Sequence, residues 1–149
     1  MMTIFRVVPH SVLALALVAA SGCCSFEREW RDSMCCVSAG DRLDGLWEGT
    51  WRSCVNNHTG RLRAIITRCD DGLYRARFHA VFWGVLPFEF TLTMTSVEAG
   101  SVTQFSGEAD LGPLAGGVYT YAGHTDGCAF ESTYCARQDH GMFRMRRVR

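Results

Sequence analysis

Two histidines in loop-like segments are the residues of this 149-residue sequence best suited to chemistry. His58 lies in "NNHT", and His140 lies in "QDHG" directly after Asp139. Imidazole binds transition metals and haem iron, and two imidazoles can also act as an acid–base pair. The alternative is two solvated polar residues. We therefore expect no resident cofactor and keep haem or a metal ion at His58 and His140 as a second hypothesis.

The cysteines form two groups, which differ in the chemistry that their spacing allows. The N-terminal group is Cys23, Cys24, Cys35 and Cys36, and it lacks the C-x-x-C spacing typical of a zinc site. The second group is Cys54, Cys69, Cys128 and Cys135. If strands follow one another in chain order, the disulfides 54–135 and 69–128 join cysteines at the same ends, with free thiols as the alternative.

Charge and missing motifs exclude several classes of function. The 15 basic residues are all arginine and are balanced by 15 acidic residues, so the chain lacks the cationic excess of nucleic-acid-binding proteins. Without lysine, Schiff-base and P-loop lysine chemistry is excluded. The sequence also has no Walker motif, no G-x-S-x-G and no H-E-x-x-H. We therefore expect a protein that is not an enzyme and has no nucleic-acid partner.

The N-terminus has the pattern of an export signal. An apolar run, "SVLALALVAA", ends in small residues just before Cys23. "ASGC" resembles the bacterial lipobox, whose cysteine is acylated, although that motif prefers leucine where Ala20 stands. Cleavage without lipid is the alternative. We expect a signal peptide over 1–22, a tether with about one helical turn over 23–43, and a lipoprotein anchored through Cys23 to a membrane of the bacterial cell envelope.

From Asp44 onward, apolar and polar residues alternate with the period of a β-strand. The pattern predicts strands at about 44–53, 60–69, 73–83, 88–97, 102–110, 118–122, 128–136 and 142–148. The connections are short, so neighbouring strands should be antiparallel. Closing such a meander removes its exposed edges. We therefore expect an all-β domain over 44–149, a single eight-stranded antiparallel up-and-down barrel, with a two-sheet sandwich as the alternative.

The first predicted strand carries "GLWEGTW", which places Trp47, Gly49 and Trp51 on one face. We expect Trp47 to close one end of the barrel and Trp51 to fill the core above it, with glycine allowing close strand contact. This stretch resembles the G-x-W strand of the lipocalin and avidin-like superfamily, and "GMFRMRR" resembles its last strand. The resemblance implies a small calycin-type barrel in which Arg147 packs over the tryptophan. It is closest to small exported bacterial proteins of that shape.

Large and small side chains alternate across the predicted interior, which suits either a filled core or an aromatic pocket. For the pocket we predict ligand contacts from Trp51, Phe78, Phe82, Phe90, Phe105 and Tyr134. Its mouth should lie at the rim formed by loops 54–59, 84–87, 111–116 and 137–141. The function expected first is non-enzymatic binding of a small apolar ligand or a partner. A haem, metal or acid–base site at the two rim histidines, and a scaffold with a filled barrel, are the alternatives; oligomeric state stays open.

Overall fold

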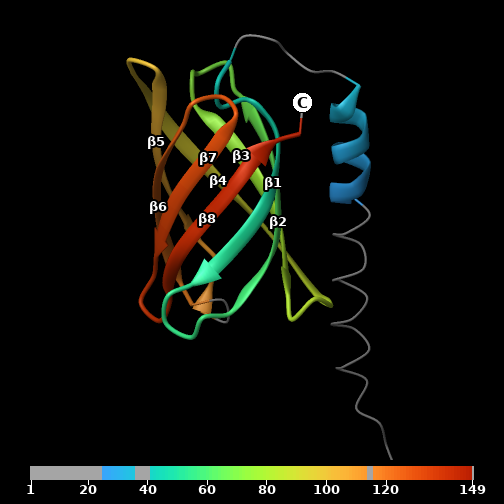
Figure 1. Ribbon diagram of the computed structural model, residues 1–149, viewed down its shortest axis with the longest axis vertical. Helices are drawn as coiled ribbons and strands as arrows, with labels where there is room; N and C mark the ends of the chain where they lie inside the picture. The colour runs from blue at the N-terminus through green and yellow to red at the C-terminus, as the bar shows by residue number, and fades with distance from the viewer. Residues whose placement is uncertain (1–24, 36–40, 114–115, 149) are drawn as a thin grey trace, which may run out of the picture.

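Eight antiparallel strands follow one another in chain order and close into a single barrel (Figure 1). The computed structural model describes residues 25–35, 41–113 and 116–148, and the structural statements below refer to them. The strands are β1 (Gly45–Ser53), β2 (Thr59–Arg68), β3 (Tyr74–Phe82), β4 (Leu86–Ala99), β5 (Val102–Asp110), β6 (Val118–Thr125), β7 (Ala129–Cys135) and β8 (His140–Arg147). Because β1 pairs with both β2 and β8, the all-β up-and-down barrel is confirmed, and the sandwich is not formed.

The alternating sequence pattern places one face of each strand inside the barrel. In β3, the side chains of Tyr74, Ala76 and Phe78 are buried, while Arg75 between them is exposed. Successive side chains on a strand point to opposite sides, so this period places one face of each strand in the barrel interior.

β4 is longer than the sequence predicts, because it begins at Leu86 and ends at Ala99. Pro87 therefore lies inside the strand, opposite Val81 of β3. Within the described pairing, β4 meets β5 only from Thr93 onward, so the first part of β4 has a free side. Proline has no N–H to donate and is tolerated at such a position. The β3–β4 hairpin consequently projects beyond the barrel wall, at the lower right of Figure 1.

The glycine between the two tryptophans of β1 allows the barrel to close. Gly49 pairs with Met145 of β8, and a Cβ atom at position 49 would collide with the carbonyl oxygen of Arg144. A side chain here would push the first and last strands apart. The bare position in "GLWEGTW" therefore serves the contact between strands, while Trp47 and Trp51 on either side fill the interior.

A helix over residues 25–34 packs on the outside of the barrel (Figure 1). Phe26 and Trp30 are buried against Leu46 of β1 and Ile65 of β2, with Val148 at the edge of the cluster. Residues four positions apart lie on one face of a helix, so these two aromatic rings form an apolar stripe. The segment expected to be a tether with about one helical turn thus contains a longer helix, stabilised by this second small core.

Charged residues surround the helix contact. Glu27 pairs with Arg63 of β2, and Glu29 pairs with Arg77 of β3. The ring of His79 is also covered by the helix, and burial lowers the pKa of this imidazole. The outer face of β3, whose polar residues suggest contact with solvent, is therefore largely occupied.

No helix in the described ranges is both long and apolar enough to cross a membrane. The predicted signal segment 1–22 and the predicted acylation site Cys23 lie outside the described residues.

Candidate functional site

One end of the barrel is closed by Trp47, which is fully buried. Its indole N–H donates a hydrogen bond to the carbonyl oxygen of Leu43 at 3.0 Å, and Leu43 is also fully buried. The guanidinium carbon of Arg147 lies 4.6 Å from the centroid of the Trp47 ring, as a cation–π contact requires. The prediction that Arg147 packs over this tryptophan is confirmed.

Arg147 also binds the backbone of the segment 41–44, which crosses this end of the barrel. Its guanidinium donates hydrogen bonds to four backbone carbonyls, those of Asp41, Arg42, Asp44 and Gly127. The carboxylate of Asp41 in turn accepts hydrogen bonds from the backbone N–H of Leu43 and from the hydroxyl of Tyr74. Residues 41–44 are thereby held across the barrel as a cover, which we call the closed end.

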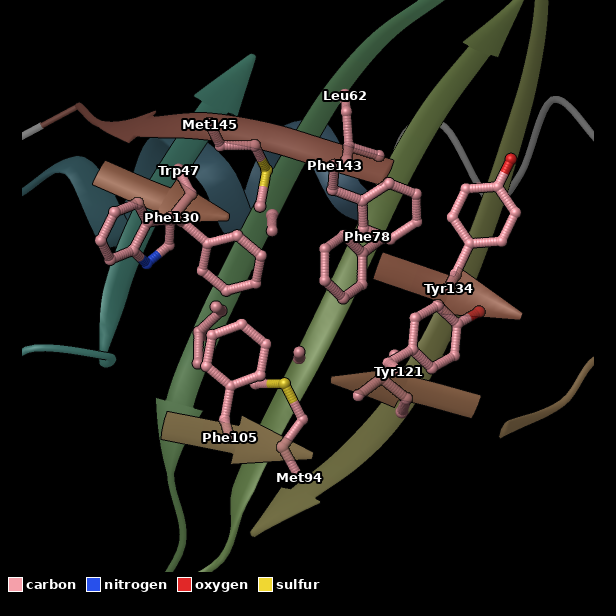
Figure 2. Close-up of a cluster of buried hydrophobic side chains, with 14 of the residues drawn as sticks. Trp47, Leu62, Phe78, Met94, Phe105, Tyr121, Phe130, Tyr134, Phe143 and Met145 are labelled. Carbon is pink, nitrogen blue, oxygen red and sulfur yellow. The ribbon is translucent and has the colours of Figure 1, made fainter. Parts of the chain in front are cut away.

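Aromatic rings fill the interior next to Trp47. The Phe130 ring centroid lies 5.6 Å from that of Trp47 and 4.5 Å from that of Phe105. Met94 and Met145 belong to the same layer (Figure 2). Interiors packed in this way are as dense as organic crystals, so this half of the barrel is a filled core.

The opposite half holds an open cavity of about 600 Å³. Aromatic side chains form much of its wall, among them Trp51, Phe82, Phe90, Tyr121, Tyr134 and Phe143. Residues from the four loops expected at this rim also line it, including Asn56, Pro87, Gly116 and Gln138. The volume falls in the range of sites for small organic molecules, about 300–1,000 Å³. We call this the open end.

Four of the six predicted contact residues line this cavity: Trp51, Phe82, Phe90 and Tyr134. Phe78 lies beneath it, because its buried ring stacks on that of Phe90 at 4.9 Å between centroids. Phe105 belongs to the filled layer around Trp47. Both residues face inward as expected, but they lie too deep in the barrel to contact the cavity.

A carboxylate stands at the mouth of the cavity. Asp139, between β7 and β8, accepts hydrogen bonds from the hydroxyls of Ser53 (2.6 Å) and Tyr134 (3.0 Å). Ser53 is itself held by the backbone N–H groups of Val55 and Asn56. Each carboxylate oxygen can accept more than one hydrogen bond, so Asp139 retains acceptor capacity toward the cavity.

Tyrosine hydroxyls supply the donors of the cavity. Burial raises the pKa of Tyr119, Tyr121 and Tyr134, and the Asp139 carboxylate adds to this for Tyr119 and Tyr134. The phenols are therefore neutral at ordinary pH. Within the described part of the chain, the hydroxyls of Tyr119 and Tyr121 make no hydrogen bond to protein. Neither Tyr119 nor Tyr121 is among the predicted ligand contacts, although the alternation in "VYTYA" places both on one face.

The two candidate histidines lie at the open end, and no ring contact among the described residues joins them. His58 and His140 are exposed, and the His58 ring meets the edge of Trp83 at 6.1 Å between centroids. Asp139, the third group expected with them, is bonded to Ser53 and Tyr134 instead. Across the described ranges, no group of three or more His, Cys, Asp or Glu side chains is placed to hold a metal ion.

The cysteines of the described segments are exposed free thiols: Cys35, Cys54, Cys69, Cys128 and Cys135. The possible disulfides 54–135 and 69–128 are not formed in the structure. The barrel order explains this: β8 lies between β1 and β7 and separates Cys54 from Cys135, and both β1 and β8 separate Cys69 from Cys128.

A second hollow, of about 710 Å³, lies between β4, β5 and β6. Its lining mixes hydroxyl and amide side chains such as Thr95, Ser106 and Gln104 with apolar ones such as Val97 and Val102. It is shallow and lacks the aromatic walls and converging polar groups of the open-end cavity, which is therefore the better candidate site.

The whole architecture, with Arg147 over Trp47 at one end and a cavity at the other, is compatible with a calycin-like barrel. A related protein of known structure would allow its cavity to be compared with the cavity of this barrel. In three comparisons, no protein-family model, no curated protein and no solved structure matches this chain.

Proposed function

We propose that this protein is an exported, lipid-anchored β-barrel of the cell envelope that binds a small apolar ligand in its open-end cavity. The observation that carries the proposal is the cavity itself, which has about 600 Å³ of space, aromatic walls and few polar side chains. Sites of this composition bury most of a small molecule and orient it with a few polar contacts. The proposed role is binding, not catalysis.

The resemblance to the lipocalin and avidin-like superfamily supports the same role. It rests on the G-x-W stretch of β1 and on the contact between Arg147 and Trp47. An eight-stranded barrel of that kind can hold one small ligand in its interior. The open-end cavity of this chain lies where such a ligand would be held.

The chemistry of the mouth favours a ligand whose polar head is neutral or cationic. Among the described lining residues, Asp139 is the only charged side chain. An anionic head would face this carboxylate at short range in a poorly solvated site, where like charges repel strongly. An ammonium or hydroxyl head could instead donate to Asp139 and meet the free hydroxyls of Tyr119 and Tyr121.

Three ligands of equal alkyl chain length test this proposal: an amine, an alcohol and a carboxylate. Tryptophan fluorescence and native mass spectrometry should show binding of the amine and the alcohol in preference to the carboxylate. Trp51 and Trp83 both line the cavity, so a chain carrying Trp51→Phe and Trp83→Phe should lose most of the fluorescence response but keep the retained mass. Asp139→Asn should abolish the advantage of the amine over the carboxylate and leave alcohol binding largely unchanged.

An isoprenoid alcohol and haem extend the same panel. Haem bound with an iron spectrum that depends on His58 and His140 would support the haem alternative instead. The absence of retained mass and of any fluorescence response across all five ligands would contradict ligand binding and leave the scaffold alternative.

The anchor of the proposed protein is Cys23, in "ASGC". One acyl chain binds a membrane only marginally, whereas several chains hold firmly, so acylation should govern fractionation. Incorporation of labelled fatty acid and recovery with membranes should both be lost in Cys23→Ala. The matched control is Cys24→Ala, which should retain both. Labelling that persists in Cys23→Ala would overturn the assignment.

A further inference from the structure

The turn between β3 and β4 contains a residue that its backbone does not favour. Trp83 and Gly84 both have positive φ angles, of 50° and 75°, and the N–H of Val85 donates to the carbonyl of Phe82 at 3.1 Å. Such a turn has the φ signs of type I′, whose central residues are usually Asn-Gly or Gly-Gly. A bulky side chain at positive φ is an outlier, so tryptophan at position 83 works against the turn.

The same turn exposes apolar surface. Trp83 is 71% exposed, Val85 82% and Leu86 52%. Consecutive exposed apolar residues stabilise nothing inside the barrel and are a liability in water unless something covers them. The turn thus has both an unfavourable backbone angle and exposed apolar side chains. Departures of this kind from ordinary folding preferences are found at functional sites. We call the segment from Trp83 to Leu86 the apolar tip.

The apolar tip borders the cavity, because Trp83 and Leu86 are among the residues that line its mouth. It is also the end of the hairpin that projects beyond the barrel wall (Figure 1). An apolar surface or molecule that covers the tip would therefore lie next to the cavity mouth, and apolar molecules could pass between the two.

The helix over 25–34 begins at its end nearer the cavity mouth. The ring of Phe26 lies 5.0 Å from that of His79, while Glu29, one turn later, pairs with Arg75. The helix therefore runs antiparallel to β3, and its residue-25 end points toward the open end (Figure 1). In the sequence, Cys23 precedes this end of the helix by two positions, so the proposed lipid is attached to the chain next to residue 25.

We propose that the apolar tip inserts into the interface of a phospholipid bilayer and holds the cavity mouth against the membrane. Tryptophan prefers the boundary between head groups and acyl chains, and Val85 and Leu86 beside it supply side chains for the apolar side. An apolar ligand could then pass between bilayer and cavity without crossing water. The inference rests on the membrane location proposed above, but not on the identity of the ligand.

Vesicles with brominated acyl chains test the proposal, because bromine quenches tryptophan on contact. The full chain is reconstituted into phosphatidylethanolamine–phosphatidylglycerol vesicles, and flotation is recorded with fluorescence. Trp83→Phe should remove most of the quenching, because Trp30, Trp47 and Trp51 are buried in the protein. A chain carrying both Trp83→Phe and Val97→Trp should not recover it, because Val97 is 68% exposed but lies toward the closed end.

A matched pair of charge substitutions adds a second readout. Val85→Asp should lower the quenching of Trp83 and shift its emission to the red, whereas Val97→Asp should change neither. Both side chains are exposed, so neither variant disturbs the core.

Three results would overturn the proposal. If the chain floats with the vesicles but Trp83 is not quenched, the membrane location stands and the orientation is wrong. If the chain does not float, both are wrong. If Trp83 is shielded from acrylamide but not quenched by brominated lipid, the tip is covered by protein and not by a bilayer.

Discussion

The two ends of the barrel are built from the same kinds of aromatic residue but use them in opposite ways. At the closed end, Trp47 has no exposed surface, and its N–H is bonded to a backbone carbonyl. At the open end, Trp51 lines a cavity and Trp83 faces solvent. The closed end satisfies its polar groups internally, whereas the open end leaves the hydroxyls of two tyrosines without a protein partner among the described residues. Stability is concentrated at one end and binding capacity at the other.

The largest effect should come from Trp47→Ala, which we expect to lower the free energy of unfolding by about 3–5 kcal/mol. The substitution empties the closed end and leaves the Leu43 carbonyl without its donor. Trp51→Ala should cost less, because that ring already borders open space. Chemical denaturation of both variants measures the difference, and equal losses would contradict the comparison.

The next effect concerns Arg147. Arg147→Met should lower the free energy of unfolding by about 2–3 kcal/mol, since it removes charge-assisted hydrogen bonds to carbonyls that water can only partly replace. Lysine at this position should recover little, because an ammonium group cannot reproduce the planar fork of a guanidinium. Arg144→Met, an exposed neighbour on β8, is the control and should change stability by about 0.5 kcal/mol or less.

Alkaline titration should distinguish the two ends of the barrel, because each end contains tyrosines whose ionisation can be followed. Burial, together with the Asp41 carboxylate, raises the pKa of Tyr74 from 10.0 to about 12. Because the pKa is higher in the folded state, the stability from this group is complete below pH 10.0 and is lost as pH rises toward 12. In Tyr74→Phe, the free energy of unfolding should therefore fall less between pH 10.0 and 12 than it does in the wild type.

Repeating the same titration with a bound ligand provides a further test. It should delay the ionisation of Tyr121, which lines the cavity, and leave that of Tyr74 unchanged, as followed by phenolate absorbance. A shift of Tyr74 on ligand binding would show that the two ends are not independent.

The smallest expected effect has the opposite sign. Trp83→Asn places a residue that tolerates positive φ in the β3–β4 turn, so the free energy of unfolding should rise by about 1 kcal/mol or less. Thermal denaturation provides the measurement. A clear loss of stability would mean that Trp83 supports the fold, and the apolar tip would no longer need an external partner to explain it.

The sequence alone was sufficient for the barrel and for the end that Trp47 closes, whereas it left a filled core and an open pocket as alternatives. Alternation with period two defines inward and outward faces, and short loops rich in Gly, Asn and Asp define antiparallel neighbours. The position of Trp47 at a strand start, and of Arg147 at a strand end, placed both at one end of the barrel. These features depend on local spacing, which a sequence displays directly.

Depth inside the barrel could not be predicted in the same way. Phe78 and Phe105 have the parity of cavity residues, but strand tilt and stagger place them in the filled half. The bonds of Asp139 to Ser53 and Tyr134 depend on loop geometry for which spacing carries no signal. The helix over 25–34 has two aromatic residues to show its packed face, too few to establish a period.

The pairing of β1 with β8 sets the order in which the barrel can be completed. Trp47 lies opposite Arg147, which is 147 − 47 = 100 positions further along the chain, while the other pairings join successive strands. Hairpins can form as the chain emerges, but ring closure must await the last segment, His140–Arg147. Until then β1 and β7 expose unpaired edges that can recruit other chains. A newly synthesised molecule therefore remains prone to aggregation through these edges until the C-terminal strand β8 has paired.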